Sequence, residues 1–89
     1  MLPKNRPPTH PGEILFAEFL KPRGMTQSEL AERLDIPRQR VNSIINAKRG
    51  VTPETAVLLA RFFKTTSQFW MNLQTQYELW FAERDLDQA

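Results

Sequence analysis

Two short helical patterns joined by a tight turn occupy the residues from Thr26 to Thr52, TQSELAERLDIPRQRVNSIINAKRGVT. Thr26 suits an N-cap, and Glu29 three residues later completes a capping box, so a helix is expected to begin here. Its inward face holds apolar residues at helical spacing, Leu30, Ala31 and Leu34. We therefore expect a helix about two turns long that packs on a core through one side.

The turn and the second helix are marked by Asp35 and Pro37. Asp35 tolerates the left-handed backbone that this turn is expected to need better than most residues do. Pro37 cannot extend the preceding helix but suits the opening of a new one, which we expect to run to about Asn46. The residues expected to face inward are Val41, Ile44 and Ile45. Those expected to face outward are Arg38, Gln39, Asn42, Ser43 and Asn46.

The outward side chains of this second helix match the donors and acceptors on DNA base edges. Arginine bonds guanine bidentately, Gln and Asn bond adenine in the same way, and Ser is short enough to sit close to either. We therefore assign sequence reading to Arg38, Gln39 and Ser43, with Asn42 beside them on the same face. Asn46 completes the face, although it is also a candidate for a left-handed turn residue.

Phosphate contacts are expected at both ends of the two helices. The amide groups that open the helix at Thr26, together with Gln27, suit an anion. Arg40 is expected to clamp a phosphate, and Lys48 and Arg49 to grip the DNA backbone at the other end. The stretch from the second helix to the glycine after it holds four basic residues and no acidic one, whereas the whole chain has a net charge of only +2. A solvated basic face is the alternative, and the agreement of turn, caps and core positions favours a binding surface.

Helical patterns also precede and follow this pair. The first is expected to run from near Pro11 to about Lys21, where the sequence PRG ends it, with Leu15, Phe16, Phe19 and Leu20 on its buried side. A fourth helix is expected after Thr52 as N-cap, with the core residues Ala56, Leu59, Ala60 and Phe63. A fifth begins near Thr66 or Ser67. No segment alternates like a strand, so we predict an all-α fold of five helices.

Composition bounds the domain organisation and the kinds of site. At 89 residues with 40% hydrophobic content, the chain is long enough for a single core. We expect a flexible arm at residues 1–9, one domain at 10–82, and an acidic tail at 83–89 that frays. The chain has no cysteine and one histidine, His10, which is more simply a cap or a surface residue than a base, so we expect no enzyme activity, metal or cofactor. No signal peptide or membrane-spanning run is seen, so we expect a cytoplasmic protein without a membrane partner.

The two central helices and their turn resemble the helix-turn-helix of the phage-repressor-like Cro/C1, or XRE, superfamily. The resemblance rests on the pattern TQ, LA, L, I, V, I and KRG with a following T. Two flanking segments resemble those of HigA-type antitoxins, the DNA-binding members of bacterial toxin-antitoxin pairs. These segments are HPGEILFAEFL, from His10 to Leu20, and TSQFWMNLQTQYELW, from Thr66 to Trp80. The resemblance implies a phage-repressor-like DNA-binding domain in an antitoxin that neutralises a RelE-like, mRNA-cleaving toxin and represses its own operon. A stand-alone transcriptional repressor of phage-like or restriction-control type, with no toxin partner, is the alternative.

Three residues depart from the family pattern. Pro37 replaces the usual Ser or Thr N-cap, so the fixed backbone angle of proline must take the place of a side-chain cap. Asp35 and Ala47 stand where the family often has Gly. Ala47 would cost about 1 kcal/mol in a left-handed conformation, unless Asn46 adopts that conformation instead. None of these changes removes an outward residue of the second helix.

The fifth helix carries more aromatic residues than one small core needs. The residues assigned to the core are Phe69, Trp70 and Leu73. Tyr77, Trp80 and Phe81 come one or two turns later, and large exposed aromatics are common at interfaces. We predict a homodimer contact through these three residues, with a toxin contact, or packing of Trp80 on the first helix, as the alternatives. A two-fold dimer would present two recognition helices roughly 34 Å apart, so the expected partner is double-stranded DNA with an inverted-repeat operator.

Overall fold

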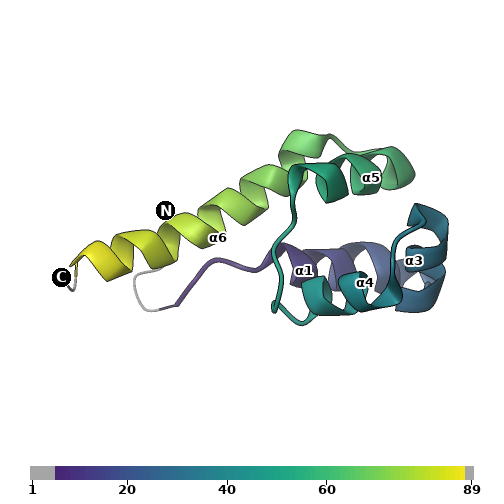
Figure 1. Ribbon diagram of the computed structural model, residues 1–89, viewed down its shortest axis with the longest axis horizontal. Helices are drawn as coiled ribbons and strands as arrows, with labels where there is room; N and C mark the ends of the chain where they lie inside the picture. Colours follow the sequence, from purple (N-terminus) through teal and green to yellow (C-terminus); the bar gives the residue numbers. More distant parts are fainter. Residues whose placement is uncertain (1–5, 88–89) are drawn as a thin grey trace.

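The computed structural model of this chain describes residues 6–87, so what was expected of residues 1–5 and 88–89 lies outside the described part. Within that part the chain is helical and contains no strand. Its elements in order are α1 (Pro11–Ile14), η1 (Leu15–Leu20), α2 (Lys21–Arg23), α3 (Gln27–Leu34), α4 (Arg38–Ile45), α5 (Pro53–Phe63) and α6 (Ser67–Asp87). Since α1, η1 and α2 follow one another without a break, they count as one helix, and the prediction of an all-α, five-helix fold is confirmed (Figure 1).

The first helix differs from expectation in its middle turn. The Lys21 N–H donates to the carbonyl of Phe16, five residues earlier, which is the hydrogen bond of a π-helix. This wider turn brings Leu15 and Leu20 to the same side, where each is 1% exposed, and leaves Phe16 46% exposed. The prediction that Phe16 is buried is therefore wrong. The helix also runs two residues past Lys21 and ends at Gly24, whose φ of 61° is left-handed.

The predicted caps and turn of the helix-turn-helix pair are present. The Thr26 hydroxyl accepts from the Glu29 N–H (3.1 Å), and the Glu29 carboxylate accepts from the Thr26 N–H (2.9 Å), which completes the capping box before α3. Asp35 ends α3 in a left-handed conformation with φ 56°, as expected. Pro37 occupies the N-cap position of α4 without a side-chain bond, so α4 begins one residue later than predicted and ends at Ile45.

The chain leaves α4 through a residue in an unfavourable conformation. Ala47 has a φ of 59°, whereas Asn46 has a φ of −88°. The suggestion that Asn46 would take the left-handed conformation in place of Ala47 is therefore wrong. Ala47 bears a cost of about 1 kcal/mol, because its Cβ crowds the backbone in this conformation.

The start of α1 lies against the end of α4. His10 is buried at the N-cap of α1, where its Nδ1 accepts the Gly12 N–H (2.9 Å), so the cap assignment is confirmed and the surface assignment is wrong. Burial lowers the pKa of His10, although the nearby Glu13 carboxylate opposes this shift. A Cβ on Gly12 would overlap the carbonyl of Ile44, so only glycine allows this approach between the two helices.

Two helices, α5 and α6, lie across from the helix-turn-helix (Figure 1). The Thr52 hydroxyl accepts the Thr55 N–H (3.3 Å) and so caps α5, and Lys64 ends this helix in a left-handed conformation. The far end of α6 extends well beyond the other helices in Figure 1, and the molecule measures 43 × 22 × 21 Å. The helix α6 continues to Asp87 and so includes residues 83–87 of the acidic tail.

The core joins all five helices through their inward faces. Trp70 of α6 is fully buried, and its indole N–H donates to the Thr65 hydroxyl (2.8 Å). The ring of Phe19 packs on Phe63 and Trp70, and so joins the first helix to α5 and α6. Phe69 is 38% exposed, so its assignment to the core is wrong. Neighbouring residues on a helix point about 100° apart, and Phe69 lies at the core's border because Trp70 points into it.

Candidate nucleic-acid interface

The residues predicted to contact DNA come from the start of α3, the outer side of α4 and the loop that follows α4. Those exposed to solvent are Thr26, Arg38, Gln39, Asn42, Asn46, Lys48 and Arg49. Those half-buried are Gln27, Arg40 and Ser43. None of the ten is withdrawn into the core, and Val41 and Ile44 hold α4 to the core from its opposite side. The arrangement leaves a polar helix face free to approach another molecule.

Three side-chain amides connect α3 to α4 across this surface. The Asn42 Nδ2 donates to Gln27 Oε1 (3.1 Å), and the Asn46 Nδ2 donates to Asn42 Oδ1 (3.2 Å). Asn42 thus uses one donor and one acceptor within the protein, and keeps one N–H and a lone pair for another partner. The spacing of Asn42 and Asn46 is that of helical neighbours, but the bond to Gln27 depends on how the two helices cross, which sequence reasoning missed.

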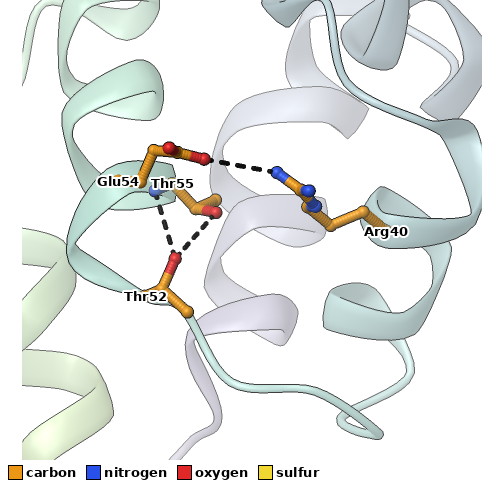
Figure 2. Close-up of polar contacts among 4 residues, drawn as sticks. All are labelled: Arg40, Thr52, Glu54 and Thr55. Atoms are coloured by element: carbon orange, nitrogen blue, oxygen red, sulfur yellow. Dashed lines mark hydrogen bonds and ion pairs between the residues drawn. The ribbon is translucent and has the colours of Figure 1, made fainter.

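Arg40 points away from α4 toward the start of α5 (Figure 2). Its guanidinium Nη1 lies 3.6 Å from the carboxylate of Glu54, next to the Thr52 cap of α5. The Glu54 side chain is 79% exposed, so water screens the pair and its contribution to stability is small. Sequence reasoning did not identify Glu54 as the counter-ion. Arg40 therefore lies beside the surface predicted to contact DNA, in an ion pair that contributes little to stability.

The loop after α4 presents two basic side chains from a fixed backbone. The N–H groups of Lys48 and Arg49 both donate to the Ser43 carbonyl, at 2.8 and 3.2 Å. The loop therefore folds back over the last turn of α4, while both basic side chains remain exposed. A hollow of about 500 Å³ opens beside this loop, and the residues that line it are Arg40, Arg49, Gly50, Val51, Thr52, Glu54, Thr55 and Glu78.

The aromatic residues of the second half of α6 pack on one another in part. Tyr77 is half-buried, with its ring 4.7 Å from that of His10 and 5.0 Å from that of Phe81. Trp80 is half-buried beside Phe81, and the Arg84 guanidinium lies 4.9 Å from the Trp80 ring centre. Phe81 is 39% exposed. Two leucines that sequence reasoning did not include, Leu79 and Leu86, are 50% and 76% exposed.

Between residues 6 and 87, no group of three His, Asp or Glu side chains is placed to hold a metal ion. Among the helices of that span, none is both long and apolar enough to cross a membrane. The exposed surface of α3, α4 and the following loop is therefore the main candidate for a functional site.

Comparison with known proteins places the chain in a family. The family model described as Helix-turn-helix (HTH_3) matches residues 16–70, which include α3 and α4. Virulence-associated protein I of Dichelobacter nodosus is 46% identical over 79 residues, which are 89% of this chain and 73% of that protein. Antitoxin HigA-1 of Vibrio cholerae is 41% identical over 76 residues, or 84% of this chain and 70% of that protein.

A solved structure is similar along nearly the whole chain. It is that of the Pseudomonas aeruginosa antitoxin HigA with the higBA promoter, which superposes with a TM-score of 0.88 at 41% identity. The match covers 91% of this chain and 88% of the other. The likeness therefore extends beyond the helix-turn-helix to α1 and α6, the two segments whose sequences resemble those of antitoxins. The chain belongs to the HigA-type antitoxin family of the Cro/C1 (XRE) helix-turn-helix superfamily.

Proposed function

We propose that this protein is a sequence-specific DNA-binding antitoxin that represses its own operon, with α4 as the recognition helix. The observation that carries the proposal is the outer face of α4, which is polar, free of acidic residues and directed to solvent. A similar chain, the Pseudomonas aeruginosa HigA, has a structure with promoter DNA, which supports the same role here. A recognition helix of this kind lies in the major groove.

The proposed DNA contacts are of two kinds, to base edges and to phosphates. Arg38, Gln39 and Ser43 read base edges, with Asn42 and Asn46 beside them. Phosphates are bound by Gln27 and the first amides of the helix that Thr26 caps, and by the basic side chains Arg40, Lys48 and Arg49. The bonds between the three amides fix the relative positions of Gln27 and Asn42, so that a phosphate contact through Gln27 sets the register of α4 in the groove.

The chain acts as a homodimer through the second half of α6. The exposed ring of Phe81, which packs on the half-buried rings of Tyr77 and Trp80, supports this proposal, because exposed aromatic side chains are common at protein contacts. Tyr77, Trp80 and Phe81 contribute the aromatic residues of the contact. A two-fold dimer places two recognition helices in successive major grooves, so the operator is an inverted repeat with half-sites roughly 34 Å apart.

The partner protein is a RelE-like, mRNA-cleaving toxin in the cytoplasm, which this chain neutralises. The support is the likeness to the Vibrio cholerae protein described as an antitoxin.

The test is co-expression of this chain with the protein encoded beside it, followed by purification and by retardation of the shared promoter DNA. A complex that retards the promoter is the expected result. DNA binding without a co-purifying partner would leave a stand-alone repressor, and loss of both would overturn the proposal.

A further inference from the structure

Gln74 on α6 is a buried amide in contact with the loop that follows α4. It is 5% exposed, and a buried amide costs free energy unless its hydrogen bonds are made. Its Oε1 accepts the Val51 N–H (2.8 Å), and its Nε2 donates to the Glu78 carboxylate (3.0 Å). The two bonds fix the orientation of the amide, because an N–H requires the oxygen and a carboxylate requires the nitrogen.

Gly50 lies directly against this amide. A Cβ at Gly50 would stand 2.6 Å from the Gln74 Nε2 and 2.9 Å from its Oε1, closer than side chains tolerate. Gly24 is the glycine with a positive φ among residues 6–87, so Gly50 has no need of glycine for its backbone angle. A side chain at position 50 would therefore displace the Gln74 amide from the place where it makes its two hydrogen bonds.

The loop with the two basic residues is thus held at both of its ends. At one end, the N–H groups of Lys48 and Arg49 bond to the Ser43 carbonyl of α4. At the other end, the Val51 N–H donates to Gln74 of α6, and Gly50 lies against the same amide. In Figure 1 this loop crosses from the side of α4 to the side of α5 and α6. The backbone that carries the two basic side chains is therefore fixed between α4 and α6.

We propose that Gln74 is a positioning residue through which α6 sets the geometry of Lys48 and Arg49, so that phosphate binding by this loop depends on α6. The proposal rests on the proposed function, since it takes those two side chains as phosphate contacts. Glu78 contributes to the same arrangement, because it accepts from Gln74 Nε2 and so keeps Oε1 directed to the Val51 N–H. Glu78 also lines the hollow beside Arg40 and Arg49, so α6 directly borders the basic surface.

The first test replaces Gln74 with methionine, which has a similar length but makes no hydrogen bond to Val51. Binding to fluorescent promoter DNA is measured over a range of salt concentrations, at a temperature where circular dichroism shows each variant folded. We expect Gln74→Met to bind about tenfold more weakly, because a buried N–H loses its partner. The slope of log affinity against log salt should fall by about 1 to 2, since fewer phosphates are neutralised. The matched control is Gln76→Met on the exposed side of α6, which should change neither quantity.

A second test exchanges the amide of Gln74 and the carboxylate of Glu78, and it does not require the methionine variant to fold. Gln74→Glu alone faces Glu78 with a like charge and should weaken DNA binding about tenfold, because opposed carboxylates replace a hydrogen bond. Adding Glu78→Gln restores the bond with donor and acceptor reversed and also restores the wild-type net charge. We expect this double variant to recover affinity and salt slope to within about twofold of wild type.

Two failures are distinguishable. If the wild-type chain does not bind promoter DNA, both the proposed function and this inference are contradicted. If the wild type binds but Gln74→Met matches Gln76→Met in affinity and salt slope, only the role of Gln74 is overturned. Failure of Glu78→Gln to rescue Gln74→Glu, with both variants folded, would equally contradict it.

Discussion

Ala47 carries backbone strain at the end of the recognition helix, because it holds a left-handed conformation without being glycine. Replacing it with glycine removes the crowding of Cβ, so Ala47→Gly should raise the free energy of unfolding by about 0.5 to 1 kcal/mol, as measured by urea titration. Ala17→Gly, at an exposed position within a helix, should lower it by a similar amount. A loss of stability in Ala47→Gly would contradict the strain assigned to this residue.

Arg38 and Lys48 are both exposed and basic, but we propose that Arg38 reads a base edge and Lys48 binds a phosphate. Arg38→Ala should weaken binding to the cognate operator by about 1 to 3 kcal/mol and relax the preference at one base step. Lys48→Ala should weaken binding to all sequences alike and reduce the salt slope by about 1. Anisotropy titrations on operator variants separate the two. If the two variants lose the same affinity for all operator variants, Arg38 does not read a base edge.

His10 makes the stability of the fold depend on pH. Its Nδ1 must stay unprotonated to accept the Gly12 N–H, and burial lowers its pKa below the ordinary value of 6.5. The unfolded chain therefore takes up a proton at a higher pH than the folded chain does. The free energy of unfolding should fall as pH drops below about 6.5, and should stop falling below the pKa of the folded state.

The measurement is urea unfolding between pH 7.5 and pH 5, a range that keeps most carboxylates ionised. His10→Asn is the control, since asparagine also caps helices but does not titrate. We expect the decrease in stability to be smaller in His10→Asn than in wild type. An equal decrease in both would assign the pH dependence to other groups.

At the scale of elements, local signals were sufficient to predict where most helices begin and end. The Thr26 capping box, the Asp35 turn and the Thr52 cap each involve residues within one turn of chain, so they could be predicted from spacing alone. The π-helical turn of η1 could not, because it follows from how Leu15 and Leu20 both reach the core. Phe16 was misplaced for that reason.

The contacts that the sequence did not reveal join residues far apart in the chain. The Val51 to Gln74 bond spans 23 residues and the Asn42 to Gln27 bond spans 15. Arg40 pairs with Glu54 across the gap between α4 and α5. Such contacts depend on crossing angles between helices, which amphipathic patterns do not specify. The types of residue at the site could thus be predicted, but their partners could not.

The second half of α6 is the element that should control assembly. Phe81 is exposed on a helix that extends beyond the rest of the molecule, so replacing it with glutamate should leave the fold intact. We expect Phe81→Glu to weaken the dimer at least tenfold, because aromatic residues dominate interface energies. Sedimentation equilibrium measures this, with Gln68→Glu, at an exposed position in the first turn of α6, as the charge-matched control. A dimer of unchanged strength in Phe81→Glu would exclude this face from the interface.

At the scale of the whole molecule, the elongated shape separates two surfaces. The helix α4 and its basic loop lie in the compact part, and the second half of α6, which carries the exposed Phe81, extends away from it (Figure 1). Because α6 also contributes Gln74, the two surfaces share one rigid element. A protein that binds the end of α6 is therefore expected to influence DNA binding through this helix.

The central claim is that the face of α4 recognises a specific DNA sequence. The most direct measurement is competition anisotropy with DNA from the chain's own promoter against a scrambled duplex of equal length, at one physiological salt concentration. We expect the promoter to bind at least about 10³-fold more tightly than the scrambled duplex. Equal affinities would mean that the surface binds phosphate alone, and would contradict the assignment of α4 as a recognition helix.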